Sequence, residues 1–405
     1  MFYPNNLRRY LIACCVCCLS ILYLALDKNV RDERSDSALE KTTKTDRSKT
    51  IFSPDEIVQM RENMSQRSQL PSNLYIIGHR GMGLSGILVD AIPENTLESF
   101  KQALVLGADG IEFDVFETKD GQLLVIHDDE LWKNVYGADL TGRELPENET
   151  QATFRVSKKN LSDILKFSVG PSGQRPPTLI EVCNLIHEAT AIRAVLGEQP
   201  VIMNIDIKDP GVAIKCFECI NTHFGQKSLS PIDFQSVYFT SSNEQALSGL
   251  AKITDHKNIN LVPQITTQQI YGANNTDEQF IVKNPKFCDL DYLQLLNHSI
   301  YANKYIGIDC VLWDVNPLLL QLCEKEKLQL HVYTSNFEKI QNYTDFIFCV
   351  YCISRMVPMF LKTDNIKEII ALLTGYGMSE DCINASKVAF IDQLPLEKPR
   401  RRGGG

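Results

Sequence analysis

Residues 76–81 read IIGHRG, residues 93–100 read PENTLESF and residues 107–128 read GADGIEFDVFETKDGQLLVIHD. Two histidines, an arginine and a Glu-x-Asp pair occur in these runs, beside apolar β-type residues or glycine-rich turns. Short apolar runs bounded by turn residues favour buried strands. The stretch therefore predicts strands that end in acid–base groups and in carboxylates able to hold a hard metal ion, as phosphodiester cleavage requires.

The rest of the chain alternates between strand-like and helical patterns. Strand-like runs occur at residues 74–78, 110–116, 201–207, 236–240, 259–265, 306–312, 328–333 and 345–350. Apolar periodicity predicts helices at residues 96–106, 178–196, 212–224, 244–253 and 317–327. The fold class is therefore α/β. Eight strand units favour a TIM (β/α)8 barrel over a doubly wound sheet, because no GxGxxG follows the first strand.

An insertion is expected after the second barrel strand. Residues 122–126 predict an extra strand, which pairs behind the turn at residues 119–121. Residues 132–177 are too long and too polar for an ordinary connection, and we interpret them as a cap over the barrel mouth.

The amino-terminal region predicts a membrane segment. Residues 11–26 are continuously apolar apart from Ser20, at the short limit of the roughly 17–25 residues that span a bilayer. Three interpretations stay open: a retained signal anchor, a cleaved signal peptide, and a cytosol-facing anchor aided by cysteine acylation. The regions expected along the chain are an anchor or signal segment at 1–27, a polar stalk at 28–72, the barrel at 73–362 with its insertion at 132–177, and a carboxyl-terminal helix and basic disordered tail at 363–405.

These features also bear on location and partners. We expect a single-pass membrane protein of the endomembranes or cell surface, or a secreted protein if the segment is cleaved. N-glycosylation sequons also favour a secretory lumen or the cell exterior. They occur at Asn63, Asn148, Asn160, Asn274, Asn297, Asn342 and Asn384. The net charge of −9 and the lack of a basic stripe argue against a nucleic-acid partner.

The acidic residues of two strands predict a metal site. Glu112 and Asp114 are two apart, so both face one side of a strand while the apolar residues between and beside them face the other. Asp206 repeats this pattern on the next barrel strand. Oxygen-only ligands suggest Mg²⁺ or Ca²⁺. The alternatives are an exposed acidic strand edge and, for Asp206, a structural ion pair with Lys208.

Four basic side chains accompany the acids. His79 follows the first strand and His127 ends the small hairpin, so the pair suits general acid–base catalysis near neutral pH. Arg80 offers a fork of donors for phosphate oxygens, and Lys208 is expected to face a phosphate as well. The remaining histidines do not lie beside such acidic and basic motif residues and are expected to be structural or surface residues.

Together these residues resemble the glycerophosphodiester phosphodiesterase family, most closely its membrane-anchored eukaryotic branch. The resemblance is carried in order by His79-Arg80-Gly81, Pro93-Glu94-Asn95-Thr96, Gly107-Ala108-Asp109, Glu112-x-Asp114, Thr118-Lys119-Asp120-Gly121, His127-Asp128 and Pro177-Thr178-Leu179-x-Glu181-Val182. It implies a TIM barrel, one divalent metal ion and two catalytic histidines.

The resemblance also implies roles for single residues. Glu112 and Asp114 match metal carboxylates, and Asp206 matches a third, where many members have Glu. His79 is assigned as base and His127 as acid. Tyr333 stands where a Trp-Thr-x-Asn run is common and is expected to wall the substrate pocket. The family's closing Thr-Asp-x-Pro element finds no match after Asp345.

Three functions follow as hypotheses. The first is metal-dependent hydrolysis of glycerophosphodiesters to an alcohol and glycerol 3-phosphate. The second is the same chemistry on lysophospholipids, which releases lysophosphatidic acid. The third, from a different class, is a catalytically silent membrane protein that binds lipid phosphate.

Overall fold

The computed structural model describes residues 50–83, 92–134, 145, 148–169, 173–222, 234–253, 259–265, 298, 305–312, 315, 317–334 and 343–375. The apolar run expected at 11–26, the stalk up to residue 49 and the basic tail lie outside these residues. Within them, no helix has the length and apolarity needed to cross a bilayer.

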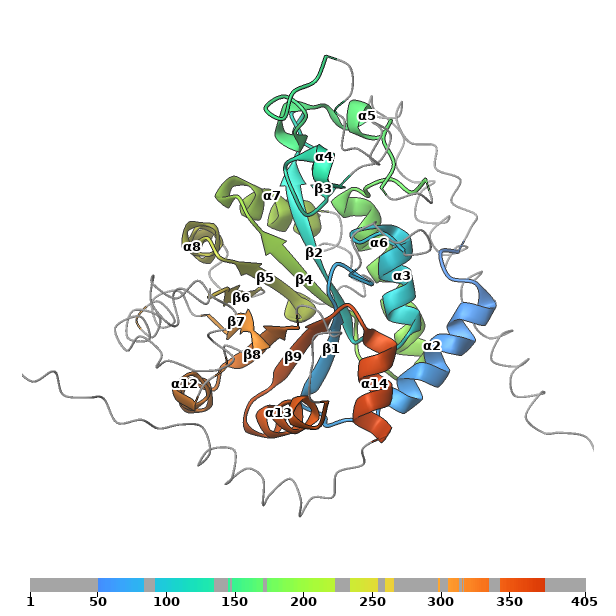
Figure 1. Cartoon of the computed structure of the whole chain (residues 1–405), viewed down its shortest axis with the longest axis vertical. Helices are drawn as coiled ribbons and strands as arrows, with labels where there is room; N and C mark the ends of the chain where they lie inside the picture. Colours follow the sequence, from blue (N-terminus) through green and yellow to red (C-terminus); the bar gives the residue numbers. More distant parts are fainter. Residues whose placement is uncertain are drawn as a thin grey trace, which may run out of the picture.

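A ring of parallel strands forms the centre of the described part (Figure 1). In spatial order these strands are β6 (Asn260–Pro263), β5 (Val237–Ser241), β4 (Ile202–Ile207), β2 (Gly110–Glu117), β1 (Leu74–Gly78), β9 (Met359–Thr363), β8 (Gln329–Tyr333) and β7 (Gly307–Val311). The two end strands approach each other, because the Ile306 amide donates to the Leu261 carbonyl at 3.0 Å and the Ile265 amide to the Asp309 carbonyl at 2.7 Å. The result is a near-closed parallel barrel of eight strands, consistent with the predicted TIM barrel.

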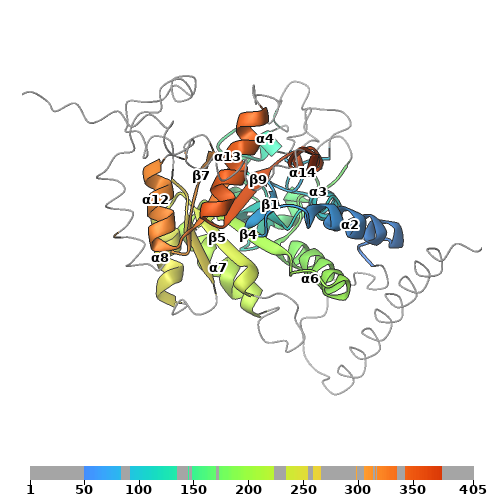
Figure 2. The same ribbon diagram turned by 90° about the horizontal axis from the view of Figure 1, so that it is seen from below.

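Helices surround the strands on the outside (Figures 1 and 2). They are α2 (Pro54–Arg67), α3 (Leu97–Val105), α6 (Leu179–Leu196), α7 (Pro210–Ile220), α8 (Glu244–Ile253), α12 (Pro317–Glu326), α13 (Tyr343–Met356) and α14 (Ile366–Gly375). Local sequence sets several of their starts. The Thr178 hydroxyl accepts from the Glu181 amide while the Glu181 side chain accepts from the Thr178 amide, a complete capping box. Thr96 caps α3 through the Ser99 amide.

The prediction for the last barrel strand was wrong. Residues 345–350 lie in helix α13, and the eighth strand is β9. The buried residues of α13 include Phe346, Ile347, Val350 and Ile353, which recur at helical spacing. A short apolar run does not by itself distinguish a buried strand from a buried helix, so the longer period decides.

The insertion after β2 has a small core of its own. It begins with β3 (Leu123–Val125), antiparallel to β2 as predicted, and continues through α4 (Leu131–Asn134), the 3-10 turn Val156–Lys158 and α5 (Leu161–Ile164). Its buried apolar residues are Leu124, Ile126, Leu131, Phe154, Val156, Ile164 and Val169. It extends beyond the end of β2 that leads into β3 (Figure 1).

The two sides of the strands divide the apolar and polar residues. The β2 residues Ile111, Phe113 and Val115 join the main core beneath the helices. Inside the barrel a second apolar layer fills the end where the strands begin, formed by Ile77, Ile202, Tyr238, Val262 and Phe360. The inward polar residues Asp206 and Lys362 lie toward the end where the strands finish, the end at which TIM barrels carry their active sites.

Candidate active site

A cavity of about 490 Å³ opens at the carboxyl ends of the strands. Its lining includes every side chain that the sequence predicted for the site, namely His79, Arg80, Glu112, Asp114, His127, Asp206, Lys208 and Tyr333. The further lining residues are Gly83, Glu94, Gln264, Lys362 and Asp364. No described residue between positions 132 and 177 lines the cavity, so the proposed cap stays a prediction.

Three buried carboxylates lie together on two adjacent strands. Glu112 and Asp114 come from β2, and Asp206 is the register partner of Asp114 on β4. One oxygen from each lies within 4.8 Å of the other two. The three side chains are nearly inaccessible to water, with exposed fractions of 3%, 1% and 6%. Such a group carries a concentrated negative charge that needs cations beside it.

Two strained backbone positions orient these carboxylates. Arg80 and Asn95 have left-handed φ values of 50° and 53°, which non-glycine residues rarely adopt. In this conformation the Arg80 amide donates to Glu112 Oε2 at 2.9 Å. The Asn95 side-chain amide donates to Asp114 Oδ2 at 3.2 Å. The two strained residues therefore hold two acidic side chains in place, and such strain is common at functional sites.

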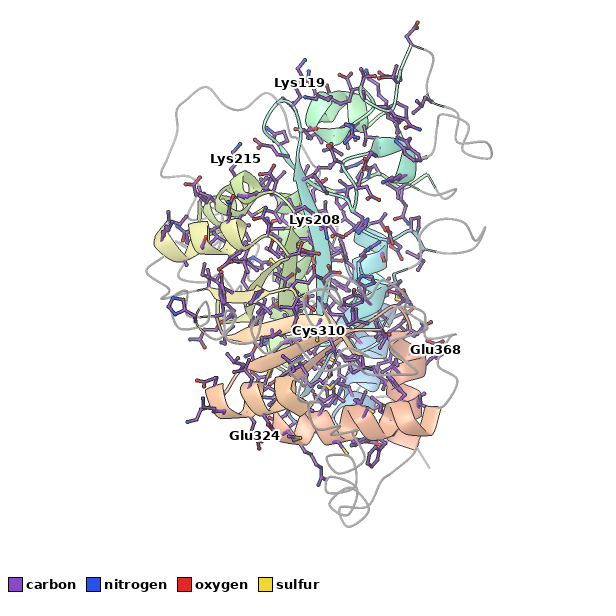
Figure 3. All side chains as sticks on the ribbon, turned by 60° about the vertical axis from the view of Figure 1, so that its left-hand side comes forward. Lys119, Lys208, Lys215, Cys310, Glu324 and Glu368 are labelled. Atoms are coloured by element: carbon purple, nitrogen blue, oxygen red, sulfur yellow. The ribbon has the colours of Figure 1, made fainter. Side chains whose placement is uncertain are left out.

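Two cations contact the acidic group from the side. Lys208 Nζ lies 2.5 Å from Asp206 Oδ2 and 3.1 Å from Asp114 Oδ1. Arg80 Nε lies 3.6 Å from Asp114 Oδ2, and its Nη1 donates to both oxygens of Glu94 at 3.1 Å. Lys208 lies among the strands, whereas Lys215 on α7 lies on the outer side of the molecule (Figure 3).

Each candidate catalytic histidine is paired with an aspartate. His79 Nδ1 lies 2.7 Å from Asp364 Oδ1, and His127 Nδ1 lies 3.0 Å from Asp128 Oδ2. A carboxylate at Nδ1 favours the proton on that nitrogen and leaves Nε2 for proton transfer. The His79 ring also stacks on Tyr333, with 6.3 Å between the ring centroids.

Burial and neighbouring charges shift the acid–base properties of the site. Burial, aided by the charge of Asp114, raises the pKa of Glu112. Burial also favours the neutral form of Asp114, but Lys208, His127 and Arg80 outweigh it and lower the Asp114 pKa. Burial favours neutral His79, yet the hydrogen bond to Asp364 and the charge of Glu112 outweigh it and raise the His79 pKa.

The donor set fits a hard divalent cation. Glu112, Asp114 and Asp206 offer only oxygen atoms, which are the ligands that Mg²⁺ and Ca²⁺ prefer. Asp206 Oδ1 is buried and accepts no hydrogen bond from the residues that the structure describes. A buried carboxylate oxygen without a donor is costly, and a bound cation would satisfy it.

Sequence reasoning missed three residues of the site. Thr363-Asp364 is the closing Thr-Asp element that was sought after Asp345, with Ile366 in place of the expected proline. Asn95 stood within a quoted motif but received no role, because its contact with Asp114 depends on a left-handed backbone. Lys362 precedes Asp364 by two residues, so the strand's alternation would have placed both in the barrel once β9 was recognised.

Comparison with known proteins finds a matching family and curated relatives. The model of the glycerophosphoryl diester phosphodiesterase family matches residues 79–356. A glycerophosphodiester phosphodiesterase of Caldanaerobacter subterraneus subsp. tengcongensis is 32% identical over 198 residues, which cover 47% of this chain and 66% of that protein. One from Bacillus altitudinis is 48% identical over 128 residues, which cover 29% of this chain and 50% of that protein.

The fold has solved counterparts as well. A crystal structure from Silicibacter pomeroyi DSS-3, assigned to the glycerophosphoryl diester phosphodiesterases, superposes with a TM-score of 0.52 at 19% identity and covers 78% of this chain and 99% of that one. At this identity the likeness bears on the fold alone. The alignments with the two curated relatives span between half and about two thirds of those proteins. The family model covers most of the barrel, including both histidines and all three carboxylates, and the chain therefore belongs to the glycerophosphoryl diester phosphodiesterase family.

Proposed function

We propose that this chain is a metal-dependent phosphodiesterase that hydrolyses glycerophosphodiesters to an alcohol and glycerol 3-phosphate. One observation carries the proposal: two aspartate-paired histidines and three clustered carboxylates line the same cavity. The family membership and the names of the curated relatives support the same reaction class.

The carboxylates are assigned to the metal ion. Glu112, Asp114 and Asp206 would hold one Mg²⁺ or Ca²⁺, which when bound supplies Lewis-acid polarisation of a phosphoryl oxygen. The chain itself prepares the site, since the Arg80 amide and the Asn95 side chain fix Glu112 and Asp114 before any ion arrives.

The histidines are assigned to proton transfer. His79 acts as the base on the attacking hydroxyl, and Asp364 holds its ring and stabilises the imidazolium that forms. If water attacks, glycerol 3-phosphate forms directly; if the neighbouring glycerol hydroxyl attacks, the alcohol leaves from a cyclic phosphate, which water then opens to glycerol 3-phosphate. His127, held by Asp128, protonates the leaving alcohol. The order of these two roles is part of the proposal.

The cations are assigned to the phosphoryl group. Arg80 Nε is buried and donates no hydrogen bond within the described residues, so it has an N–H available for a phosphate oxygen. Lys208 lies beside Asp114 and Asp206 and adds positive charge where negative charge develops in the transition state.

The lining indicates a small polar substrate. Apart from Gly83, the described walls consist of charged, imidazole and amide side chains with one phenol ring, that of Tyr333. Such walls suit hydroxyls and phosphate better than a long acyl chain. We therefore place glycerophosphodiesters before lysophospholipids, and an acylated substrate is a separate arm of the test below.

The amino-terminal region completes the proposal. We propose that residues 1–27 attach the chain to an endomembrane or the cell surface. Residues 28–72 then lead to a barrel at 73–362, which a carboxyl-terminal helix and a basic tail follow at 363–405. The support is the apolar run at 11–26. Carbonate extraction of membranes from cells that express the full chain or a chain lacking residues 1–27 tests this. Release of the full chain by carbonate contradicts it.

The activity is tested with the purified chain. Glycerophosphocholine, glycerophosphoethanolamine, glycerophosphoinositol and lysophosphatidylcholine are each incubated with and without chelator, and glycerol 3-phosphate or lysophosphatidic acid is measured. Glycerol 3-phosphate that appears only with divalent metal supports the proposal. His127→Ala should abolish it, while His298→Ala, at an exposed position, should not. A folded chain without diesterase activity on any of the four substrates points instead to a silent phosphate-binding protein.

A further inference from the structure

A buried ion pair crosses the barrel beneath the catalytic groups. Lys362 on β9 pairs with Asp309 on β7, and their side chains are only 3% and 0% exposed. Strand β8 lies between β7 and β9, so the two side chains meet inside the barrel rather than along one strand pair. Removing two charges from water is costly, and an apolar pair of similar volume is often as stable. Stability alone therefore gives little reason for this pair.

Lys362 belongs to the cavity wall as well as to the pair. It lines the cavity, two residues before Asp364 on the same face of the chain. Asp364 is the partner of His79. Lys362 Nζ lies 5.9 Å from the centre of the Tyr333 ring, and this ring stacks on His79. The ammonium thus lies next to the groups that surround the candidate base.

The ammonium keeps donors for a ligand. A lysine ammonium has three N–H donors. Among the residues that the structure describes, Lys362 Nζ donates one hydrogen bond, to Asp309 Oδ2. A side chain this deeply buried that still lines a cavity offers its remaining donors to whatever enters the cavity. Gln264, whose strand bridges to that of Asp309, adds an amide to the same wall.

The charge of the pair indicates what kind of group it binds. Asp309 neutralises Lys362, and the carboxylates of Asp364 and Glu112 line the same cavity. A second anion would meet this negative surrounding without compensation. A hydroxyl, by contrast, accepts from the ammonium with its lone pair and donates its own proton to a carboxylate or amide oxygen.

We propose that Lys362, held by Asp309, is a specificity-determining residue that binds a hydroxyl group of the glyceryl part of the substrate. This inference rests on the proposed function and deepens it: the Glu112 side of the cavity takes the phosphoryl group and the Lys362 side takes the polyol. A buried donor left unpaired penalises any ligand that lacks the matching oxygen. The chain should therefore prefer glyceryl over simple alkyl phosphates.

The experiment measures binding, because a missing hydroxyl could also remove the nucleophile of the reaction. Competitive inhibition constants are determined for glycerol 3-phosphate and for propyl phosphate, which has the same carbon chain and phosphate but no hydroxyl. The wild-type chain should bind glycerol 3-phosphate about tenfold to a hundredfold more tightly, the range expected for hydrogen bonds to a charged group. Equal binding of both ligands by the wild type overturns the inference without any variant.

The variant removes both charges together, since Lys362→Met alone would leave Asp309 buried and unpaired. In Asp309→Asn/Lys362→Met the ratio of the two inhibition constants should fall to about threefold or less, while propyl phosphate binds as before. Lys252→Met, at an exposed position on α8, should keep the wild-type ratio. A double variant that folds, as its thermal melting shows, and keeps the wild-type ratio also overturns the inference. Failure of the proposed function gives a distinct result: the wild type then hydrolyses no diester, whatever the ratio of the two inhibition constants.

Discussion

Asp364 and His79 stand 285 positions apart in the chain, yet Asp364 Oδ1 lies 2.7 Å from His79 Nδ1. The pairing follows from the barrel, in which β9 runs parallel to β1 with Gly78 opposite Thr363. The strand that ends the barrel thus delivers a carboxylate to the histidine that follows its first strand. Removal of the Asp364 carboxylate should therefore change the acid–base behaviour of His79.

Asp364→Asn should lower kcat about a hundredfold or more, because the asparagine cannot stabilise the imidazolium of His79. The pH profile should change too. Asp364 raises the His79 pKa, so its removal lets His79 lose its proton at lower pH, and the acidic limb of kcat/KM should move to lower pH. Asp163→Asn, in an exposed ion pair with Lys166, is the matched control. An unmoved acidic limb would show that His79 is not the base.

Asn95 permits a test that separates backbone strain from ligand positioning. Asn95→Ala removes the hydrogen bond to Asp114 and places an alanine at a φ of 53°, which costs about 1–2 kcal/mol of unfolding free energy. Asn95→Gly removes the same bond but tolerates the backbone.

Both Asn95 variants should bind divalent metal about 10-fold to 100-fold more weakly, as is usual when a partner of a metal ligand is lost. The alanine variant should also unfold at a lower urea concentration than the glycine variant, because only alanine is strained at this φ. Isothermal titration with Mg²⁺ and Ca²⁺ and urea unfolding measure the two effects. Unchanged metal affinity in both variants would remove Asn95 from the metal site.

Asp206 should tolerate a longer acid but not a neutral side chain. Asp206→Asn removes one of three charges and leaves Lys208 with a single carboxylate partner. Metal affinity should fall, and kcat/KM should fall at least about a hundredfold, since a metal ion supplies several kcal/mol of transition-state stabilisation. Asp206→Glu keeps the charge and should retain most of the activity. Equal losses in both variants would indicate that geometry rather than charge decides the role of this position.

His331 predicts a dependence of stability on pH. It is fully buried inside the barrel, and burial together with the charge of Lys362 lowers its pKa well below the usual 6.5. Above pH 6.5 the imidazole is neutral in both the folded and the unfolded chain. Below pH 6.5, His331 takes up a proton in the unfolded chain but stays neutral in the folded chain. The free energy of unfolding therefore falls by up to about 1.4 kcal/mol per pH unit.

Urea unfolding of the wild type and of His331→Gln between pH 5 and pH 8 measures this effect. The wild-type free energy should decline more steeply below pH 6.5 than that of the variant. Parallel curves would mean that other groups cause the decline.

The sequence predicted most of the site because most of it is local. Glu112 and Asp114 lie on one strand, and period-two alternation alone places them on one face. His79 follows β1, and the antiparallel hairpin of β2 and β3 returns His127 to the same rim. All eight predicted side chains line the cavity, including Tyr333, which the family resemblance rather than strand alternation indicated.

What the sequence did not reveal depends on pairing over long distances or on backbone angles. Asp364 was missed because residues 345–350 imitate a strand although they lie in α13, which displaced the expected end of the barrel. The pair of Lys362 and Asp309 exists only after β7, β8 and β9 are in register. The role of Asn95 depends on its left-handed φ, and the pattern of apolar residues in the sequence does not reveal that backbone angle.

The pairing of β9 with β1 has a consequence for synthesis of the chain. The ribosome releases residues 74–128, with both histidines and two of the three acids, long before residue 364 emerges. Until β9 pairs with β1, His79 lacks its partner Asp364, and Lys362 is not yet in place beside the cavity. On the proposed function, a nascent or truncated chain should therefore be inert, and we expect hydrolysis only once translation has passed the final strand.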